Sequence, residues 1–288
     1  MNSVVSGGSE SQQQPAVPGR HSKDPPQPTV VITIPVRNEA QTLFDNVMRL
    51  SKGLTGSGIR YKLSIAEDGS TDDTPSEIAK LQATMPDLIV TSSPTRLGRG
   101  LALRRLWSQL DADIFAFIDA DLAAGPEALV RVLSEIQNGA DVVTGSRYCL
   151  GARVRRPPVR EWVSRSYNAM VRFWFKDDIL DHQCGLKAFT RDSKNRLMKM
   201  ALEDSWAWDT EVLVLAVRSG MIVREVPVDW VEYRLKRTPF RRLLSDIRLH
   251  GLSLIRLKGR IEERLASSRL AKSEPLHGDA GEAIVTSK

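Results

Sequence analysis

The chain has 288 residues, 41% of them hydrophobic, which is enough to build one large α/β domain or two small ones. Its two cysteines, Cys149 and Cys184, exclude a disulfide framework, and with four scattered histidines they give no zinc-ligand spacing. They favour a reducing, cytosolic setting. The formal net charge of +6 indicates an anionic partner, which is nucleic acid, a phosphorylated substrate or anionic lipid.

The N-terminal stretch, residues 1–28, is polar and rich in Ser, Gln and Pro. It lacks the apolar core of a signal peptide, and we predict a disordered tail. No apolar run approaches the roughly 18 to 20 residues that cross a bilayer. We therefore expect any membrane contact to be peripheral, at the cytoplasmic face, or to be made through a membrane-anchored subunit.

Strand and helix patterns alternate through the first half. The β-branched apolar run 30–34 predicts a strand buried on both faces, which Pro35 should end. Further strands are expected at 63–66, 88–91, 114–118 and 141–144. Helices are expected from Ala40 to about Leu50, from Thr74 to before Pro86, at 98–110 and at 125–139. This alternation predicts an α/β fold, with a mainly parallel central sheet flanked by helices, in a domain spanning residues 29–237.

After Gly151 the chain becomes basic and aromatic. Helices are expected at about 162–175 and 208–219, and a strand at 223–230, as an elaboration of the same sheet and not as an independent domain. We expect residues 238–270 to form a basic amphipathic helical segment and residues 271–288 to form a disordered tail. The segment's apolar face should carry Phe240, Leu243, Leu244, Ile247, Leu254 and Ile255. It is expected to lie on a membrane surface, to pack on the domain, or both.

Two carboxylates, Asp119 and Asp121, directly follow the apolar strand 114–118. In open α/β sheets, ligands bind beyond the carboxyl ends of the strands. Mg²⁺ or Mn²⁺ takes a few carboxylate oxygens and completes its shell with water and phosphate oxygens. We therefore predict a metal site at Asp119 and Asp121. On this motif alone, carboxylates that merely cap the next helix are an equal alternative.

Two other loops follow strands on the same edge, at residues 34–39 and 66–73. Carboxylates in these loops can accept hydrogen bonds from a nucleobase or a ribose hydroxyl. For each loop alone, ordinary turn chemistry is the alternative, because Asp-Gly-Ser is typical of turns. Together with the Asp119 loop they predict a nucleotide site.

The ordered motifs resemble glycosyltransferase family two, which has the GT-A (nucleotide-diphospho-sugar transferase) fold. More narrowly, they resemble the dolichol-phosphate mannose synthase and dolichol-phosphate glucose synthase group. The resemblance covers about residues 29–240. The matching stretches are Ile34-Pro35-x-x-Asn38-Glu39, Asp68-Gly69-Ser70-x-Asp72, Gly98-x-Gly100-x-Ala102-x-Arg104, Asp119-Ala120-Asp121-Leu122, Gly145-Ser146-Arg147, Gln183-Cys184-Gly185-Leu186-Lys187, Trp208-Asp209-Thr210-Glu211 and Glu225-Val226-Pro227-Val228.

The resemblance implies roles for individual residues. The donor nucleotide sugar should be bound by Pro35, Arg37, Glu39, Ala66, Asp68, Asp119, Ala120, Asp121 and Arg147. The expected catalytic residues are Asp121, Arg147 and Asp209, with Mg²⁺ or Mn²⁺ on Asp119 and Asp121. The Gln that the family often carries two positions after the second Asp is Ala123 here, so we expect a water in its place.

Arginines between Gly145 and Arg160 favour a phosphate as the acceptor. An alcohol acceptor needs a general base, whereas a phosphate monoester is already anionic near neutral pH and needs cations. Arginine suits bidentate phosphate binding, although a solvated basic surface is the alternative. The expected acceptor-phosphate residues are Arg147, Arg153, Lys187 and Arg234.

The sequence therefore predicts an inverting, metal-dependent transferase that moves a hexose from GDP-mannose or UDP-glucose to a polyprenyl (dolichyl) phosphate. One alternative is a hydroxyl acceptor on a glycan, lipid or protein, with Asp209 or Glu211 as base. A nucleotidyltransferase lacks its Gly-rich phosphate loop here. A nucleic-acid-binding protein lacks a recognised motif. A non-catalytic nucleotide-sugar-binding subunit is the last alternative.

Overall fold

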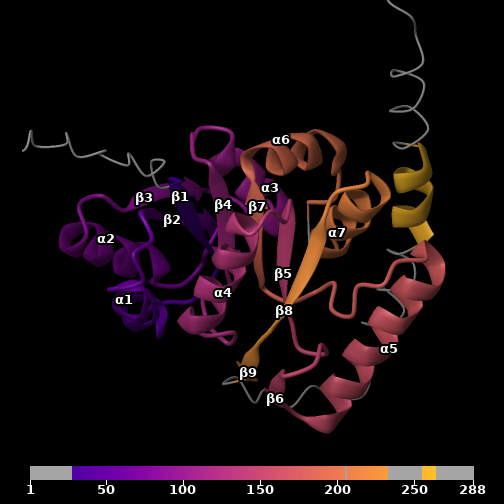
Figure 1. The fold of residues 1–288 in the computed structure, drawn as a ribbon. Helices are drawn as coiled ribbons and strands as arrows, with labels where there is room; N and C mark the ends of the chain where they lie inside the picture. Colours follow the sequence, from indigo (N-terminus) through magenta and orange to yellow (C-terminus); the bar gives the residue numbers. More distant parts are fainter. Residues whose placement is uncertain (1–27, 205, 233–254, 264–288) are drawn as a thin grey trace, which may run out of the picture.

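A computed structural model describes residues 28–204, 206–232 and 255–263 of the chain. Its centre is a seven-stranded sheet in the order β3-β2-β1-β4-β7-β5-β8 (Figure 1). The strands are β1 Val30–Val36, β2 Tyr61–Asp68, β3 Ile89–Ser93, β4 Ile114–Ile118, β5 Val142–Ser146, β7 Leu186–Thr190 and β8 Val223–Pro227. Only β7 runs antiparallel to its neighbours. The predicted α/β fold with a mainly parallel sheet is confirmed.

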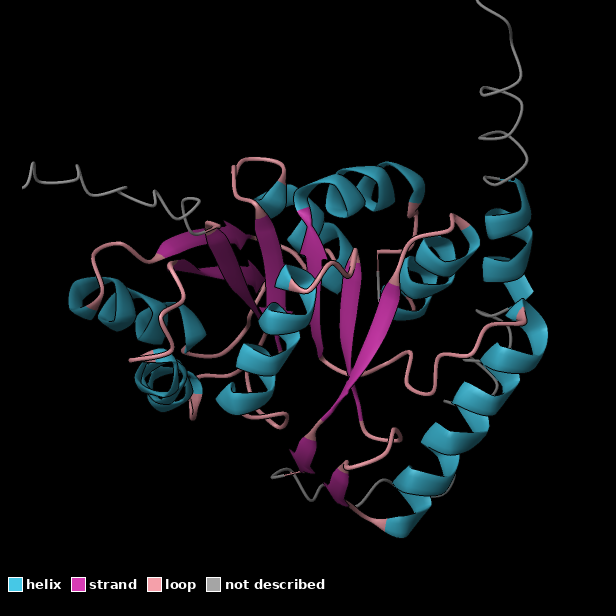
Figure 2. Cartoon of the chain, viewed as in Figure 1, coloured by secondary structure: helices cyan, strands magenta, loops and turns pink. Residues whose placement is uncertain are grey.

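Helices cover both faces of the sheet (Figure 2). One hydrophobic cluster lies under α1 Leu43–Leu54, α2 Thr74–Thr84 and α4 Pro126–Gln137. The other lies under α3 Arg99–Trp107, α5 Pro158–Phe175, α6 Arg191–Met200 and α7 Trp208–Arg218. Within β1, Ile32 and Ile34 join the first cluster and Val31 joins the second. Burial on both faces explains why this strand is a continuous apolar run.

Several predicted boundaries were wrong. Strand β1 continues through Pro35 to Val36, because its pairing with β4 ends at Thr33 and no ladder hydrogen bond needs the missing N–H. Helix α1 starts at Leu43 rather than Ala40, after a turn in which the amides of Thr42 and Leu43 both bind Glu39 O. Helix α3 ends at Trp107, three residues before the predicted end.

The second half contains elements that the sequence did not reveal, namely β7, α6 and the short strand β6 Arg153–Arg155. The strand predicted at 223–230 is divided at Val228. Its first part, β8, joins the large sheet, and its second part, β9 Asp229–Val231, pairs with β6. Helix α5 starts at Pro158, four residues before the predicted start.

The predicted tails and most of the basic segment 238–270 lie outside the described residues, so these boundaries stay predictions. Residues 255–263 are helical, and Leu257 and Ile261 are buried in the cluster that also contains Val171 and Phe175 of α5. Ile255, predicted to share the apolar face, is instead 58% exposed. Among the described residues, no helix is both long and apolar enough to cross a bilayer.

The order of the strands places a ligand site between β1 and β4. The chain builds the sheet outward from β1 to β3 and then returns to add β4 on the other side of β1. Crevices for ligands form where the strand order reverses in this way. Because β7 is antiparallel, its first residue Leu186 lies opposite the last residue of β4, Ile118. The loop before β7 therefore reaches the same edge.

Candidate active site

A cleft of about 330 Å³ opens at the carboxyl ends of β1, β2 and β4. It is lined by Pro35, Val36, Arg37, Glu39, Asp68, Arg96, Gly98, Arg99, Ala102, Asp119, Ala120, Asp121 and Trp206. Seven of the nine residues predicted to bind the donor are among them. The three loops that the sequence singled out separately thus share one cavity.

The first two loops of the cleft are tied together by hydrogen bonds. The Asn38 amide donates to Ser70 Oγ at 3.0 Å, and Asn38 Oδ1 accepts from the Thr71 amide at 2.8 Å. The Glu39 amide donates to Thr74 Oγ1 at 2.8 Å. Asn38 has a positive φ of 56°, a conformation that Asn tolerates better than most residues. These contacts hold the rim beside Glu39 in one geometry.

Asp68 anchors the start of α3. Both of its carboxylate oxygens accept from the Gly98 amide, at 3.1 and 3.0 Å, and Oδ1 also accepts from the Leu97 amide. Gly98 has a φ of 94°, which favours glycine. Asp68 therefore positions Arg99, the first residue of the helix, as well as lining the cleft.

Asp119 is held against the loop that precedes β7. Its amide donates to Gly185 O at 2.8 Å. A Cβ built on Gly185 would overlap the Asp119 carboxylate, so only glycine is accommodated there. Asp121 is two residues further along the chain, and its Oδ1 accepts a hydrogen bond from the Ala123 amide at 3.1 Å. Both carboxylates thus lie at the end of β4 and face the same cleft.

Arg99 bridges two acidic residues. Its Nη2 lies 3.0 Å from Asp119 Oδ1, and its Nη1 lies 2.7 Å from Asp209 Oδ2. Burial, together with the nearby Asp121 and Asp209, raises the pKa of Asp119 to about 6, although Arg99 acts in the opposite direction. The sequence did not identify Arg99. The only signal was its place between the two glycines of the Gly98-x-Gly100 motif.

Two predicted site residues bind each other beneath the cleft. Lys187 is fully buried, and its Nζ contacts Asp209 Oδ1 at 2.9 Å and Cys184 O at 2.8 Å. Asp209 is 2% exposed and also holds Arg99. As placed, Lys187 and Asp209 neutralise each other. Their predicted roles, in acceptor binding and catalysis, stay predictions.

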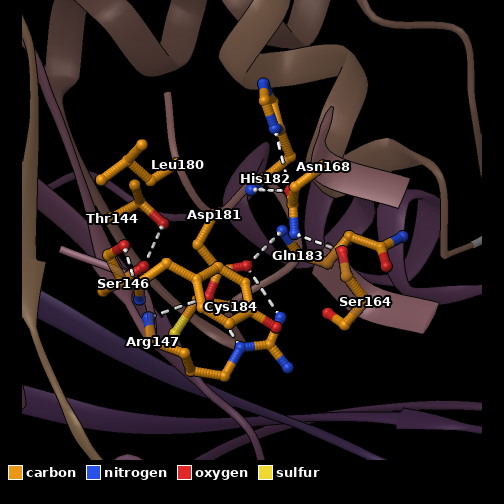
Figure 3. A network of polar contacts seen from close by, with 12 residues as sticks. Thr144, Ser146, Arg147, Ser164, Asn168, Leu180, Asp181, His182, Gln183 and Cys184 are labelled. Atoms are coloured by element: carbon orange, nitrogen blue, oxygen red, sulfur yellow. Dashed lines mark hydrogen bonds and ion pairs between the residues drawn. The ribbon is translucent and has the colours of Figure 1, made fainter. Parts of the chain in front are cut away.

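Arg147 lies outside the cleft, in a buried network (Figure 3). Its guanidinium binds Asp181 through two parallel hydrogen bonds of 2.7 Å and lies over the ring of Trp230. Burial tends to raise the pKa of Asp181, but Arg147 outweighs it, so that the pKa is lowered. Asp181 in turn is positioned by Glu225, which accepts from its amide at 2.9 Å. The predicted contact of Arg147 with phosphates stays a prediction.

The loop before β7 is also fastened to α5 (Figure 3). Asn168 Oδ1 accepts from the His182 amide at 2.8 Å and lies 3.0 Å from His182 Nδ1. On the other side of the ring, Asp177 Oδ1 lies 3.1 Å from Nε2. Because residues 181–185 end at the glycine that touches Asp119, α5 is connected to the cleft by a short, buried path.

The remaining predicted residues lie apart from the cleft or outside the described chain. Ala66 is buried within β2, Arg153 is exposed on β6, and Arg234 lies outside the described residues. Conversely, six residues that line the cleft were not among the predicted site residues, and Arg96, Arg99 and Trp206 are the three of these with large polar or aromatic side chains. Trp206 gave no signal because it precedes α7 in a stretch with no motif of its own.

The acidic residues of the cleft suit a hard divalent cation with few protein ligands. The described part of the chain contains no group of three or more His, Cys, Asp or Glu side chains placed to hold a metal. Asp119 and Asp121 can supply two carboxylates, and Ala123 supplies only a backbone amide. Mg²⁺ and Mn²⁺ accept such a set, with water and phosphate oxygens as the other ligands.

Comparison with known proteins identifies the fold and the family. The family model for glycosyl transferase family 2 matches residues 31–198. Glycosyltransferase AglD of Haloferax volcanii is 37% identical over 70% of this chain and 33% of its own length. The polyprenol monophosphomannose synthase of Mycolicibacterium smegmatis is 30% identical over 73% of this chain and 80% of that protein. The dolichyl-phosphate beta-glucosyltransferase of Saccharomyces cerevisiae is 28% identical over 61% of this chain and 58% of that protein. The chain thus spans about a third of AglD.

Solved structures share the fold. Glucosyl-3-phosphoglycerate synthase from Mycobacterium tuberculosis, in complex with Mn²⁺, uridine diphosphate and glucosyl-3-phosphoglycerate, gives a TM-score of 0.60 at 23% identity. The match covers 81% of this chain and 80% of that one. The GT-A fold expected from the sequence is thereby confirmed.

The close packing of Gly185 on Asp119 can be tested by substitution. Gly185→Ala should lower the free energy of unfolding by about 1–3 kcal/mol, because the added methyl group has no space beside the carboxylate. Urea denaturation measures this. The matched control is Gly259→Ala, where a Cβ meets nothing within 4 Å in a helix, and it should be neutral or stabilising. Equal stability of the two variants would contradict the packing described here.

The buried pair of Arg147 and Asp181 should matter more for stability than any surface pair. Asp181→Asn leaves a buried guanidinium without its counter-charge and should cost about 3–5 kcal/mol. As a control, Glu77→Gln breaks an exposed pair with Lys80 and should cost less than about 1 kcal/mol.

The same pair predicts a dependence of stability on pH. The pKa of Asp181 is lower in the folded state than in the unfolded state. The ionised carboxylate therefore adds to the free energy of unfolding at a pH above its unfolded pKa, and this stabilisation is lost as the pH falls through its folded pKa. Asp181→Asn should lack this acid-dependent loss when unfolding is measured between neutral and acidic pH. A wild type and variant with parallel pH profiles would show that the pair does not stabilise the fold.

Proposed function

The chain belongs to glycosyl transferase family 2, and we propose that it transfers a hexose from a nucleoside-diphosphate sugar to a polyprenyl phosphate. The observation that carries the proposal is the shared cleft, in which Asp119 and Asp121 face Asp68 and Glu39 across the ends of three strands. Carboxylates suited to a base or ribose lie on one side, and carboxylates suited to a cation lie on the other.

The donor would lie along this cleft. Glu39 and Asp68 would meet the nucleoside, and the exposed side chains of Arg37 and Arg96, which line the same cleft, would bind phosphate oxygens. Asp119 and Asp121 would hold Mg²⁺ or Mn²⁺, which supplies positive charge for the diphosphate as it leaves. The Mn²⁺ named with the synthase from Mycobacterium tuberculosis supports a divalent cation without deciding between the two.

The acidic residues of α7 favour a phosphate acceptor over a hydroxyl. A hydroxyl acceptor needs a general base. Asp209 is 2% exposed and already engaged by Arg99 and Lys187. Glu211 is buried and accepts two backbone hydrogen bonds, from the amides of Leu202 and Glu203. Neither lines the cleft, whereas a phosphate is already anionic and can attack without a base, by a single displacement that inverts the sugar.

The names of the relatives support a lipid phosphate. The yeast relative is named for dolichyl phosphate and the mycobacterial relative for polyprenol monophosphomannose. Because one is named a glucosyltransferase and the other a mannose synthase, both UDP-glucose and GDP-mannose stay candidate donors for this chain.

An exposed apolar face on α5 supports a peripheral contact with a membrane. Val159, Trp162 and Phe173 are 57%, 67% and 79% exposed and recur near helical spacing along the helix. Exposed Lys176 follows them at the end of the helix, and Arg165 is 60% exposed although it pairs with Glu161 at 2.7 Å. Aromatic side chains beside basic ones are typical of helices that lie at the surface of anionic bilayers. The contact would bring the cleft near a lipid acceptor, at the cytoplasmic face if the sequence-based prediction holds.

Catalysis can be tested with purified full-length chain and a panel of nucleotide sugars. With a short polyprenyl phosphate and Mg²⁺ or Mn²⁺, we expect a glycolipid product from UDP-glucose or GDP-mannose, and none after chelation with EDTA. Asp119→Asn should lower turnover by at least about a hundredfold because it weakens charge stabilisation at the leaving group.

The control for this experiment is Asp113→Asn, which removes an exposed carboxylate beyond the other end of β4. It should retain most of the activity. Product from a hydroxyl acceptor but not from the lipid phosphate would contradict the proposed acceptor. Tight nucleotide-sugar binding without product from any donor would support a non-catalytic binding subunit instead.

Membrane contact can be tested by sedimentation with vesicles of phosphatidylcholine and phosphatidylserine. Replacing both Trp162 and Phe173 with Ala should weaken binding by at least about tenfold, because two large apolar side chains no longer insert. Ile222→Ala is the matched control, since it removes an exposed apolar side chain away from α5. Equal vesicle binding by all three proteins would exclude α5 as the contact surface.

A further inference from the structure

Arg99 is the basic side chain in direct contact with a proposed metal ligand. Its side chain is 29% exposed and lines the cleft, and its two terminal nitrogens are divided between Asp119 and Asp209. The planar fork of arginine allows this division, which a lysine ammonium does not offer in the same way. Burial alone would lower the pKa of Arg99, but the two carboxylates raise it, so the residue stays a cation.

The two carboxylates that bind Arg99 differ in how firmly they are themselves held in place. Asp209 is buried and fixed from its other side by Lys187, while Asp119 opens to the cleft. The backbone of Arg99 is also fixed, because Asp68 binds the Gly98 amide immediately before it. The contact with Asp209 can therefore persist while the contact with Asp119 is exchanged.

A divalent cation and Arg99 compete for Asp119. Both are positive, and Asp119 Oδ1, 3.0 Å from Arg99 Nη2, is an oxygen that the cation would use. A cation that binds alone must break the ion pair between Arg99 and Asp119. Nη2 of Arg99 is then left without an acceptor in a partly buried place, and an unpaired charge there is energetically unfavourable. A diphosphate that arrives as well gives Nη2 a new acceptor of the kind arginine prefers.

We propose that Arg99 couples the binding of the divalent cation to the binding of the nucleoside diphosphate. In the free protein it is the counter-ion of Asp119 and opposes binding of the cation alone. When cation and nucleotide bind together, Nη2 transfers from Asp119 to the diphosphate while Nη1 stays on Asp209. Arg99 is thus a positioning residue, and this inference rests on the proposed donor and metal sites.

The coupling has a measurable sign. If the diphosphate provides a new acceptor for Arg99, the cation binds without leaving Nη2 unpaired. The two ligands then bind with positive cooperativity, and each increases the affinity of the other by the same factor. Removing Arg99 should therefore tighten Mn²⁺ binding in the absence of nucleotide and should reduce the additional tightening that nucleotide provides. Some tightening remains, since diphosphate oxygens themselves bind the cation. A purely structural residue would not move the two quantities in opposite directions.

The test is a titration of full-length protein with Mn²⁺, followed by the electron paramagnetic resonance signal of free Mn²⁺, with and without UDP or GDP. In Arg99→Met, Mn²⁺ alone should bind at least about threefold more tightly than in the wild type. The factor by which nucleotide tightens Mn²⁺ should fall by about tenfold, within the usual range of coupling between sites. Thermal unfolding confirms that the variant is folded, as Lys187 still pairs with Asp209.

Arg105→Met is the matched control. Arg105 lies on the same helix as Arg99, is exposed and carries the same charge, but it does not line the cleft. It should change the affinity for Mn²⁺ alone by less than about twofold. Should Arg99→Met not fold, Arg99→Lys provides the test. Lysine has one terminal nitrogen, so it cannot keep one nitrogen on Asp209 while another moves to the diphosphate, and the coupling should also fall.

Unchanged or weaker Mn²⁺ binding by Arg99→Met in the absence of nucleotide would overturn the inference, as would an equal effect of Arg105→Met. The outcome is separate from the proposed function, because no turnover is measured. Chains that couple Mn²⁺ and nucleotide through Arg99 but make no glycolipid would refute the acceptor and leave the inference intact. Absence of Mn²⁺ binding in every protein would overturn the metal site itself.

Discussion

The buried ion pair between Lys187 and Asp209 is the interaction on which the site depends. It joins β7 to α7 in a place where water does not reach either charge. An unpaired charge there would be costly, so each residue requires the other. The pair leaves one Asp209 oxygen for Arg99, and Arg99 in turn reaches Asp119. The charge of the cleft therefore depends on an ion pair that is buried beneath it.

The antiparallel strand β7 explains how residues distant in sequence reach this edge. A parallel strand in its position would have carried the preceding loop to the opposite end of the sheet. Because β7 is reversed, residues 181–185 lie at the carboxyl end of β4, with Gly185 against Asp119. The same loop is fastened to α5 through His182 and Asn168. A helix with an exposed aromatic face is thus connected to the cleft through one short segment.

The sequence predicted the site residues that follow the ends of strands, and it missed the residues whose positions depend on buried ion pairs with distant partners. Asp119 and Asp68 were recognisable because each follows an apolar run, and parallel strands bring their ends together. Strand β7 was missed because Lys187 was assigned to the loop of Gln183, Cys184 and Gly185, where it would bind the acceptor phosphate. No local pattern shows that Lys187 has a buried partner 22 positions later, in Asp209. Arg99 was missed for the same reason, since both of its partners are distant in sequence.

The arginines after β5 show why a count of charges does not locate an anion site. Arg147 is committed to Asp181, and Arg156 and Arg160 both contact Glu232. Of the five arginines in this cluster, only the two exposed ones on β6, at positions 153 and 155, have no described ion pair. The exposed arginines at positions 37 and 96 instead line the cleft. An anion gains little from a cation whose ion pairs stay intact, so the phosphates are expected where exposed guanidiniums and Asp119 share one cavity.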